Sequence, residues 1–149
     1  MQASGEGGLS PGKKAPSFTA TDYEGRVVRL DDFQGQRRIL AFILPGCSSC
    51  TGTMSALNSF VQSEDVTKVF VIGGSDRELN HAYALEHETH LTVLTPTRDF
   101  HAGLYQIQGV PFVFVIDEAG IIRAKGVVNE DEQLQRLLAG AFALTSVSQ

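Results

Sequence analysis

The most informative segment of the chain reads Leu44-Pro45-Gly46-Cys47-Ser48-Ser49-Cys50-Thr51, and it contains both cysteines of the sequence. A structural disulfide stabilises a protein mainly by closing a long loop, so a bridge across two intervening residues would contribute little. A zinc or iron–sulfur site needs about four ligands, whereas a single C-x-x-C pair offers two. The spacing of the cysteines therefore favours redox chemistry over a structural staple or a metal centre.

The residues on either side of this segment predict a strand followed by a helix. Residues 38–44 form an apolar run with aromatic and β-branched members, which is typical of a strand buried on both faces, and Pro45-Gly46 ends it. Residues 51–62 carry apolar side chains at helical spacing, namely Met54, Leu57, Phe60 and Val61. We therefore expect the cysteines at the point where a buried strand passes into a helix.

This position gives the two cysteines different expected roles. The free N–H groups and the positive dipole end of a helix N-terminus favour an anion, and the thiolate is the nucleophilic form of cysteine. Cys47 is therefore the expected attacking group. Cys50 lies three residues further on, close enough to form a disulfide with Cys47 and to resolve a mixed disulfide. We expect Cys50 to be the more buried of the two.

Length, composition and charge exclude several classes of protein. The 149 residues predict one domain, and 42% hydrophobic with 19% charged residues is typical of a globular chain. A net charge of −5 without clustered basic residues argues against a nucleic-acid partner. The longest apolar run is residues 39–44, far shorter than the roughly twenty residues that cross a bilayer, so no membrane span is expected.

The first residues of the chain do not resemble a secretory signal, because they have neither a basic start nor an apolar middle. If the protein works outside the cytoplasm, we expect its leader to be missing from this sequence. Residues 1–11 are rich in Gly and Ser and are predicted to be a linker or tag remnant, with a single domain over residues 12–149.

The rest of the chain predicts short strands that alternate with helices. Hairpins are expected from residues 17–21 with 26–30 and from 113–116 with 121–127, and further strands over 68–72 and 91–94. Further helices are expected over residues 77–87, 99–107 and 129–144, with inward side chains at Leu79, Tyr83, Leu85, Leu134, Leu137, Leu138 and Phe142. The fold class is α/β, with a central mixed sheet flanked by helices.

A strand, a C-x-x-C pair at a helix start, Val110-Pro111 before a later strand, a hairpin and a last helix together resemble the thioredoxin fold over residues 12–142. The segments Gly12-Lys13-Lys14-Ala15-Pro16-Ser17-Phe18, Asp22-Tyr23-Glu24-Gly25 and Leu30-Asp31-Asp32-Phe33-Gln34-Gly35 are similar to the N-terminal hairpin extension of TlpA/ResA-type thiol–disulfide oxidoreductases and of peroxiredoxins. Residues 120–129 are similar to the MauD-like, methylamine-utilisation accessory branch of that group.

This resemblance implies a thiol–disulfide oxidoreductase that acts on cysteines of partner proteins and receives or delivers electrons through an upstream redox partner. It implies no organic cofactor, an extracytoplasmic bacterial location and a monomer. The proline that matches Pro111 is cis in the family and packs beside the active-site disulfide, so we expect a catalytic role for it. We expect Val110, through its backbone, and Gly46, beside the first cysteine, to bind the substrate polypeptide.

The chain departs from the family at positions that move protons. Thioredoxins carry an acid on the strand before the motif, where this chain has Ala41, and ResA-like proteins carry a Glu where it has Thr53. Family members also often have an aromatic residue at the position of Gly46. With water, a hydroxyl or the partner left to serve Cys50, we expect mixed disulfides to be resolved more slowly than in a thioredoxin.

Two other functions remain as alternatives. A peroxiredoxin-like peroxidase would share Pro45-Gly46-Cys47, but it needs a hydroxyl where the chain has Leu44 and usually an arginine near Val110. A copper-binding module on a thioredoxin scaffold would use the soft thiolates, with a third ligand drawn from His81, His87, His90 and His101.

Overall fold

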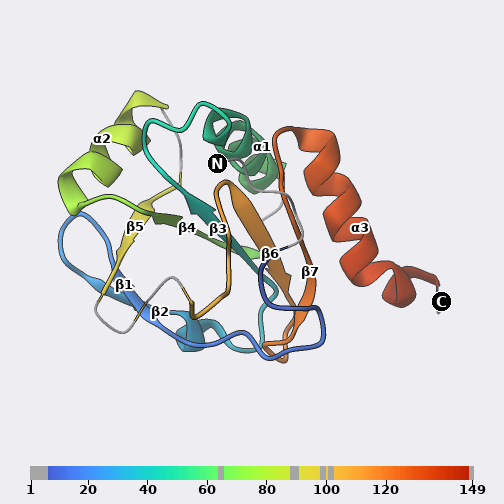
Figure 1. Cartoon of the computed structure of the whole chain (residues 1–149). Helices are drawn as coiled ribbons and strands as arrows, with labels where there is room; N and C mark the ends of the chain where they lie inside the picture. Colours follow the sequence, from blue (N-terminus) through green and yellow to red (C-terminus); the bar gives the residue numbers. More distant parts are fainter. Residues whose placement is uncertain (1–6, 64–65, 88–90, 98–99, 101–102, 148–149) are drawn as a thin grey trace.

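The computed structural model describes residues 7–63, 66–87, 91–97, 100 and 103–147. In this part of the chain the strands form one seven-stranded sheet in the order β2-β1-β5-β4-β3-β6-β7 (Figure 1). The strands are β1 Thr19–Thr21, β2 Val27–Arg29, β3 Arg38–Ile43, β4 Lys68–Gly73, β5 Val93–Pro96, β6 Phe112–Ile116 and β7 Ile122–Gly126. The helices are the 3-10 turn η1 Leu30–Phe33 and the α-helices α1 Cys50–Ser63, α2 Arg77–Glu86 and α3 Asp131–Val147.

The sheet is mixed, as the sequence predicted. The strands β3, β4 and β5 run parallel to one another, while β6 and β7 and the hairpin of β1 and β2 are antiparallel to their neighbours. All six residues of β3 are buried, which confirms the predicted two-sided burial. Because β3 is paired on both sides, parallel with β4 and antiparallel with β6, the segment after its carboxyl end leaves from a firmly held strand.

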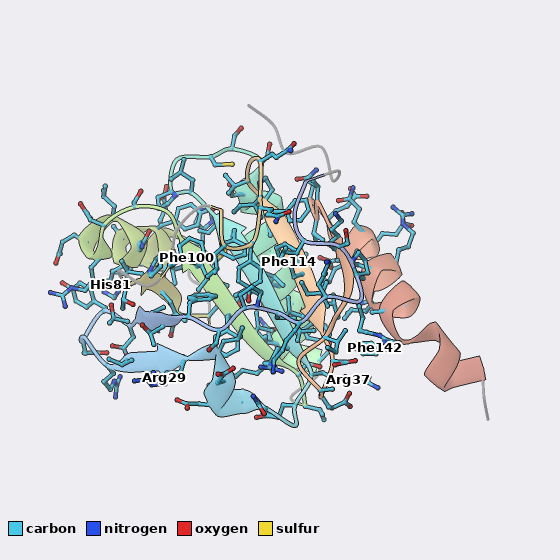
Figure 2. The ribbon with its side chains drawn as sticks, turned by 60° about the horizontal axis from the view of Figure 1, so that its bottom comes forward. Arg29, Arg37, His81, Phe100, Phe114 and Phe142 are labelled. Carbon is cyan, nitrogen blue, oxygen red and sulfur yellow. The ribbon has the colours of Figure 1, made fainter. Side chains whose placement is uncertain are left out.

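The side chains of β3 divide between two hydrophobic clusters, one on each face of the sheet. Ile39, Ala41 and Ile43 pack with residues of α1, α2 and α3, so all three α-helices lie on this face. Leu40 and Phe42 belong to the other cluster, whose cover comes from the N-terminal segment, η1 and the stretch around Tyr105. Figure 2 shows Phe100 and Phe114 lying in the interior on this second face. Both faces of the central strands β3 and β6 are therefore covered.

The predicted helix over residues 99–107 is wrong for its described part. Phe100 is not helical, residues 103–106 form a turn, and Gln106 has a left-handed backbone with a φ of 57°. The carbonyls of Tyr105 and Gln106 accept hydrogen bonds from the backbone N–H groups of Leu9 and Gly8, at 2.9 and 2.7 Å, instead of bonding within a helix. Residues 99, 101 and 102 lie outside the described residues.

Part of the segment predicted as a linker is docked on the domain. Besides the bonds to Tyr105 and Gln106, Lys125 Nζ donates to the carbonyls of Gly7 and Gly8, at 2.9 and 3.0 Å, and Leu9 packs against the hydrophobic cluster. The composition of these residues gave no sign of docking, because their contacts use backbone groups. Residues 1–6 lie outside the described residues.

The buried face of α2 differs from the predicted one. Leu79 and Leu85 are 55% and 65% exposed, whereas Asn80 and Tyr83 are buried, so only Tyr83 was placed correctly. The Asn80 side-chain amide donates to the carbonyl of Gly73 and to Thr95 Oγ1, at 3.2 and 2.8 Å, which turns this polar residue inward. In α3, Leu134 is buried and Leu137 and Leu138 are half-buried, as predicted.

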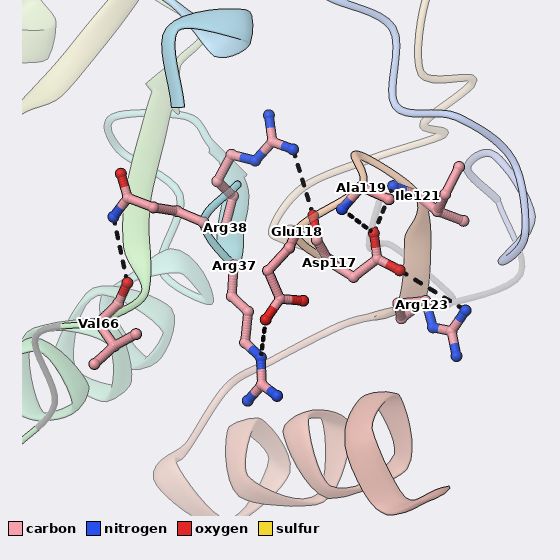
Figure 3. A network of polar contacts seen from close by, with 9 residues as sticks. Arg37, Arg38, Val66, Asp117, Glu118, Ala119, Ile121 and Arg123 are labelled. Atoms are coloured by element: carbon pink, nitrogen blue, oxygen red, sulfur yellow. Dashed lines mark hydrogen bonds and ion pairs between the residues drawn. The ribbon is translucent and has the colours of Figure 1, made fainter. Parts of the chain in front are cut away.

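The ends of the elements far from α1 are tied together by arginines. The buried Arg38 donates from Nη1 to the Leu30 carbonyl at 3.0 Å. Its Nη2 donates to the Asp117 carbonyl at 3.4 Å (Figure 3). The Asp117 carboxylate accepts the N–H groups of Ala119 and Ile121, which explains this residue by the turn between β6 and β7. Arg37 lies over the ring of Phe142, where α3 is kinked, as Figure 2 shows.

None of the described helices has the length and apolar character needed to span a membrane.

Candidate active site

Both cysteines lie in the segment that joins β3 to α1, as the sequence predicted. The backbone N–H of Cys47 donates to the Leu44 carbonyl at 3.0 Å, and the N–H of Cys50 donates to the Cys47 carbonyl at 3.1 Å. These two turns bring the chain from the end of the strand to Cys50, the first residue of α1. Cys47 therefore lies one turn before the helix, on the side of its free N–H groups.

The two thiols differ in exposure. Cys50 is 0% exposed and belongs to the helix-side cluster, while Cys47 is half-buried at the margin of that cluster. Burial raises the pKa of the Cys50 thiol to about 12, the Cys47 side chain adds to this rise, and a backbone hydrogen bond with Leu44 opposes it. The expected asymmetry is confirmed: Cys50 is the protected thiol and Cys47 is the one that solvent reaches.

Val110 and Pro111 lie beside this segment. Phe112 pairs with Phe42 in the antiparallel register of β6 and β3, so the residues before Phe112 run alongside those that follow β3. The Val110–Pro111 peptide bond is cis, as the family resemblance implied. Val110 is partly buried and packs against the cluster that contains Cys50 and, at its margin, Cys47. The structure thus brings the predicted partner edge next to the cysteine pair.

Gly46 leaves open space in front of Cys47. Its backbone is left-handed, with a φ of 90°, a conformation that glycine adopts without steric cost. A Cβ placed on Gly46 would meet no described atom within 4 Å. The neighbouring Leu44 is 42% exposed and forms an apolar surface on the same segment.

Both positions at which the resembled families carry an acid hold a buried, non-acidic residue here. Ala41 is fully buried in β3. Thr53 is also fully buried, and its hydroxyl donates to the carbonyl of Val128, so it fastens α1 to the segment before α3. Gly52 packs so closely on that segment that a Cβ would lie 2.0 Å from the Asn129 carbonyl oxygen. The slower resolution expected from the sequence stays a prediction.

One ionisable group near the cysteines was not recognised from the sequence as part of the site. Tyr83 is 4% exposed and belongs to the same cluster as Cys50. Burial, and next to it negative charge on Cys50, raise the pKa of Tyr83 to about 12. The helical pattern of residues 77–87 placed this side chain inward, but no sequence motif linked α2 to the cysteines.

The histidines considered as copper ligands have other neighbours where they are described. His81 stacks on the ring of Tyr23 with centroids 3.7 Å apart, and the ring of His87 lies 4.2 Å from that of Tyr83. His90 and His101 lie outside the described residues. In the described ranges, no group of three or more His, Cys, Asp or Glu side chains is placed to hold a metal ion.

Comparisons with known proteins agree with this geometry. The sequence model of the family described as Redoxin matches residues 10–139. The methylamine utilization protein MauD of Paracoccus denitrificans is 32% identical over 130 residues, and the match covers 85% of this chain but only 64% of that protein. The thiol-disulfide oxidoreductase ResA of Bacillus cereus is 26% identical over 132 residues, covering 85% of this chain and 76% of ResA. The solved thioredoxin domain of a thiol-disulfide oxidoreductase from Bacteroides vulgatus superposes with a TM-score of 0.77 at 22% identity, over 86% of this chain and 97% of that one.

Proposed function

Because the chain belongs to the Redoxin family, we propose that it is a thiol–disulfide oxidoreductase that exchanges electrons with cysteines of partner proteins through Cys47 and Cys50. The observation that carries this proposal is the unequal exposure of two thiols in one turn, with Cys47 half-buried and Cys50 fully buried. A thiol that must attack a partner needs access, and one that only displaces the partner afterwards does not.

The reduction of a partner disulfide proceeds in two balanced steps. The Cys47 thiolate attacks one sulfur of the partner, a Cys47–partner bond forms, and the other partner sulfur leaves with the electron pair. Cys50 then loses its proton to solvent and attacks Cys47 Sγ, so that the Cys47–Cys50 disulfide forms and the first partner sulfur leaves with the second electron pair. The protein loses two electrons and the partner disulfide gains them. Oxidation of a partner dithiol is the reverse sequence.

The segment around Val110 provides the docking edge in this proposal. The backbone of Val110 lies beside the cysteines, and Gly46 adds space for the residues that flank the partner cysteine. Backbone pairing along such an edge holds an extended peptide without requiring a particular sequence. We therefore assign substrate binding to Gly46 and Val110 and place Pro111 next to the disulfide.

The partners and the location belong to the same proposal. We assign the protein a cysteine-containing protein substrate. We also assign it an upstream redox partner, because the cysteine pair must return to its starting oxidation state after each turnover. An extracytoplasmic location is proposed because disulfides persist in oxidising compartments. We propose a monomer. The chain spans 64% of the length of the MauD proteins that it matches, so their full activity is not assumed for it.

A trapping experiment tests the proposal. The variant Cys50→Ala, incubated with a peptide that contains one disulfide, should accumulate a covalent adduct on Cys47, whereas the wild type should release a reduced peptide. Cys47→Ala is the matched control and should form no adduct, because the fully buried Cys50 cannot be reached by the peptide. Adducts on Cys50, or equal adduct yields in the two variants, would rule out the assigned roles.

A further inference from the structure

The hydroxyl of Tyr83 is an anomaly in the buried core. Its oxygen is inaccessible and has no hydrogen-bond partner among the described residues. Burying a hydroxyl without a partner is unfavourable, and such exceptions in folded proteins call for a physical reason. The contrast with Tyr105 makes the point, because that buried hydroxyl donates to the Pro16 carbonyl on the other face of the sheet.

The fold directs Tyr83 toward the cysteine side of the molecule. Asn80 fixes the start of α2 to the carboxyl ends of β4 and β5 by its bonds to Gly73 and Thr95. Tyr83 follows three residues later, on the same helix face, because residues three apart are neighbours on an α-helix. It joins the cluster that contains Cys50, with Cys47 at the margin.

We propose that the Tyr83 hydroxyl donates a hydrogen bond to the Cys50 thiolate whenever that thiolate forms during disulfide exchange. This inference rests on the proposed function and supplies what the sequence lacks at Ala41 and Thr53, a polar group that serves the resolving cysteine. In the dithiol form the O–H group is unpaired and therefore available.

The electrostatics around Tyr83 keep this donor protonated. The pKa of Tyr83 is raised to about 12, mainly by burial and in smaller part by negative charge on Cys50, Cys47 and Glu86. Thr51 lies close enough to lower this pKa, without meeting the geometry of a hydrogen bond. Among the described residues, His87 is a further titratable neighbour, through its ring contact. Because a thiolate at Cys50 makes Tyr83 harder to ionise, the hydroxyl still carries its proton when the thiolate appears.

The proposed hydrogen bond from Tyr83 stabilises the Cys50 thiolate in one step of each direction of disulfide exchange. During resolution, Cys50 gives its proton to the buffer, the thiolate is stabilised by Tyr83, and the Cys50–Cys47 bond forms as the Cys47–partner bond breaks. In the reverse direction, the partner thiolate attacks Cys47, the Cys50–Cys47 bond breaks, and the electron pair stays on Cys50 Sγ, where the proposed hydrogen bond from Tyr83 stabilises it. Tyr83 exchanges no electrons and forms no covalent bond in either case.

Two-phase thiol kinetics test this role in the full chain. Reduced protein mixed with 5,5′-dithiobis-(2-nitrobenzoate) releases a first thionitrobenzoate when Cys47 attacks the reagent and a second when Cys50 attacks the mixed disulfide. In Tyr83→Phe we expect an unchanged first phase and a second phase slowed about tenfold, the ratio that one unit of thiol pKa produces. The plot of second-phase rate against pH should be displaced upward by about one pH unit.

The matched control is Tyr105→Phe, which removes a buried hydroxyl from the opposite face of the sheet. It should lower the melting temperature, because a hydrogen bond is lost, and leave both phases unchanged. Tyr83→Phe should not lower the melting temperature and can raise it, because its buried hydroxyl has no bond to lose among the described residues. A slowed second phase without loss of stability therefore separates the proposed role from a packing defect.

Two results would overturn the inference, and they differ. If the wild type releases two equivalents and Tyr83→Phe resolves within about twofold of it, without a displaced pH profile, Tyr83 has no part in the exchange and the proposed function stands. If the wild type releases a single equivalent, Cys50 does not resolve the adduct, and the proposed function falls together with the inference.

Discussion

Cys50, the first residue of α1, is protected by burial and still lies close to Cys47. The sulfur is fully buried, yet it lies within one turn of the half-buried Cys47. The C-x-x-C spacing and the expected strand-to-helix junction were enough to predict that Cys50 is the more buried cysteine. The spacing could not predict Tyr83, which is 33 residues further along the chain and reaches the site only through the packing of α2.

The difference in exposure predicts selective alkylation. When the reduced, folded protein is treated with a limiting time of iodoacetamide, we expect modification of Cys47 and protection of Cys50, because Cys50 is fully buried and its thiolate is disfavoured. Peptide mass spectrometry measures the two sites separately. Unfolding in denaturant is the control and should make both cysteines reactive. Similar labelling of both sites in the folded protein would contradict the assigned burial.

At the scale of elements, the start of α1 is clamped from behind. Thr53 bonds to the Val128 carbonyl, and Gly52 approaches the Asn129 carbonyl with no room for a side chain. This contact joins the helix that carries Cys50 to the segment that leads into α3. It holds the resolving cysteine at a fixed position relative to the sheet.

A pair of glycine substitutions in two helices tests this clamp. Gly52→Ala should destabilise the protein by about 1–3 kcal/mol, since its Cβ would overlap the Asn129 oxygen. Gly140→Ala in α3 meets no described atom and should stabilise by about 0.5–1 kcal/mol through helix propensity. Urea unfolding measures both. A neutral Gly52→Ala would show that α1 can move away from the segment without loss.

The elements that the sequence predicted well are those whose burial pattern is strong. The strand β3 is apolar after Arg38 and α1 has an apolar stripe, so both were placed within a residue or two. The face of α2 was misjudged because Asn80 is buried by its hydrogen bonds to Gly73 and Thr95, a tertiary effect that periodicity does not contain. Residues 103–106 form a turn rather than the predicted helix, because carbonyls of this segment accept hydrogen bonds from the distant residues Gly8 and Leu9. The local sequence does not contain this information.

At the scale of the whole molecule, the oxidation state of the cysteine pair is coupled to the pH dependence of stability. Folding raises the pKa of Cys50 from its ordinary value of 9.0 to about 12. Between these values the folded protein keeps a proton that the unfolded chain has lost, so the stability of the dithiol form falls as the pH rises. The disulfide form has no such proton and escapes this loss.

We therefore expect the stability difference between the oxidised and reduced proteins to grow with pH. The contribution from Cys50 amounts to about 1 kcal/mol between roughly pH 8 and pH 10. Urea unfolding with and without a phosphine reductant measures it. Tyr83 and Tyr105 also have raised pKa values, but they are present in both forms and largely cancel in the difference. A difference that stays constant over this pH range would contradict the assigned burial of Cys50.

Gly46, whose backbone is left-handed, has no side chain that could cover the sulfur of the neighbouring Cys47. Any other residue at position 46 would adopt a left-handed conformation that costs an L-amino acid about 1–2 kcal/mol. A bulky side chain beside Cys47 would therefore destabilise the protein. If the proposed exchange with partner proteins holds, the exposed apolar side chain nearest in sequence to this position that could contact a partner is Leu44. Substitution of Leu44 is therefore the better way to change which polypeptides the protein accepts, because this side chain is already exposed.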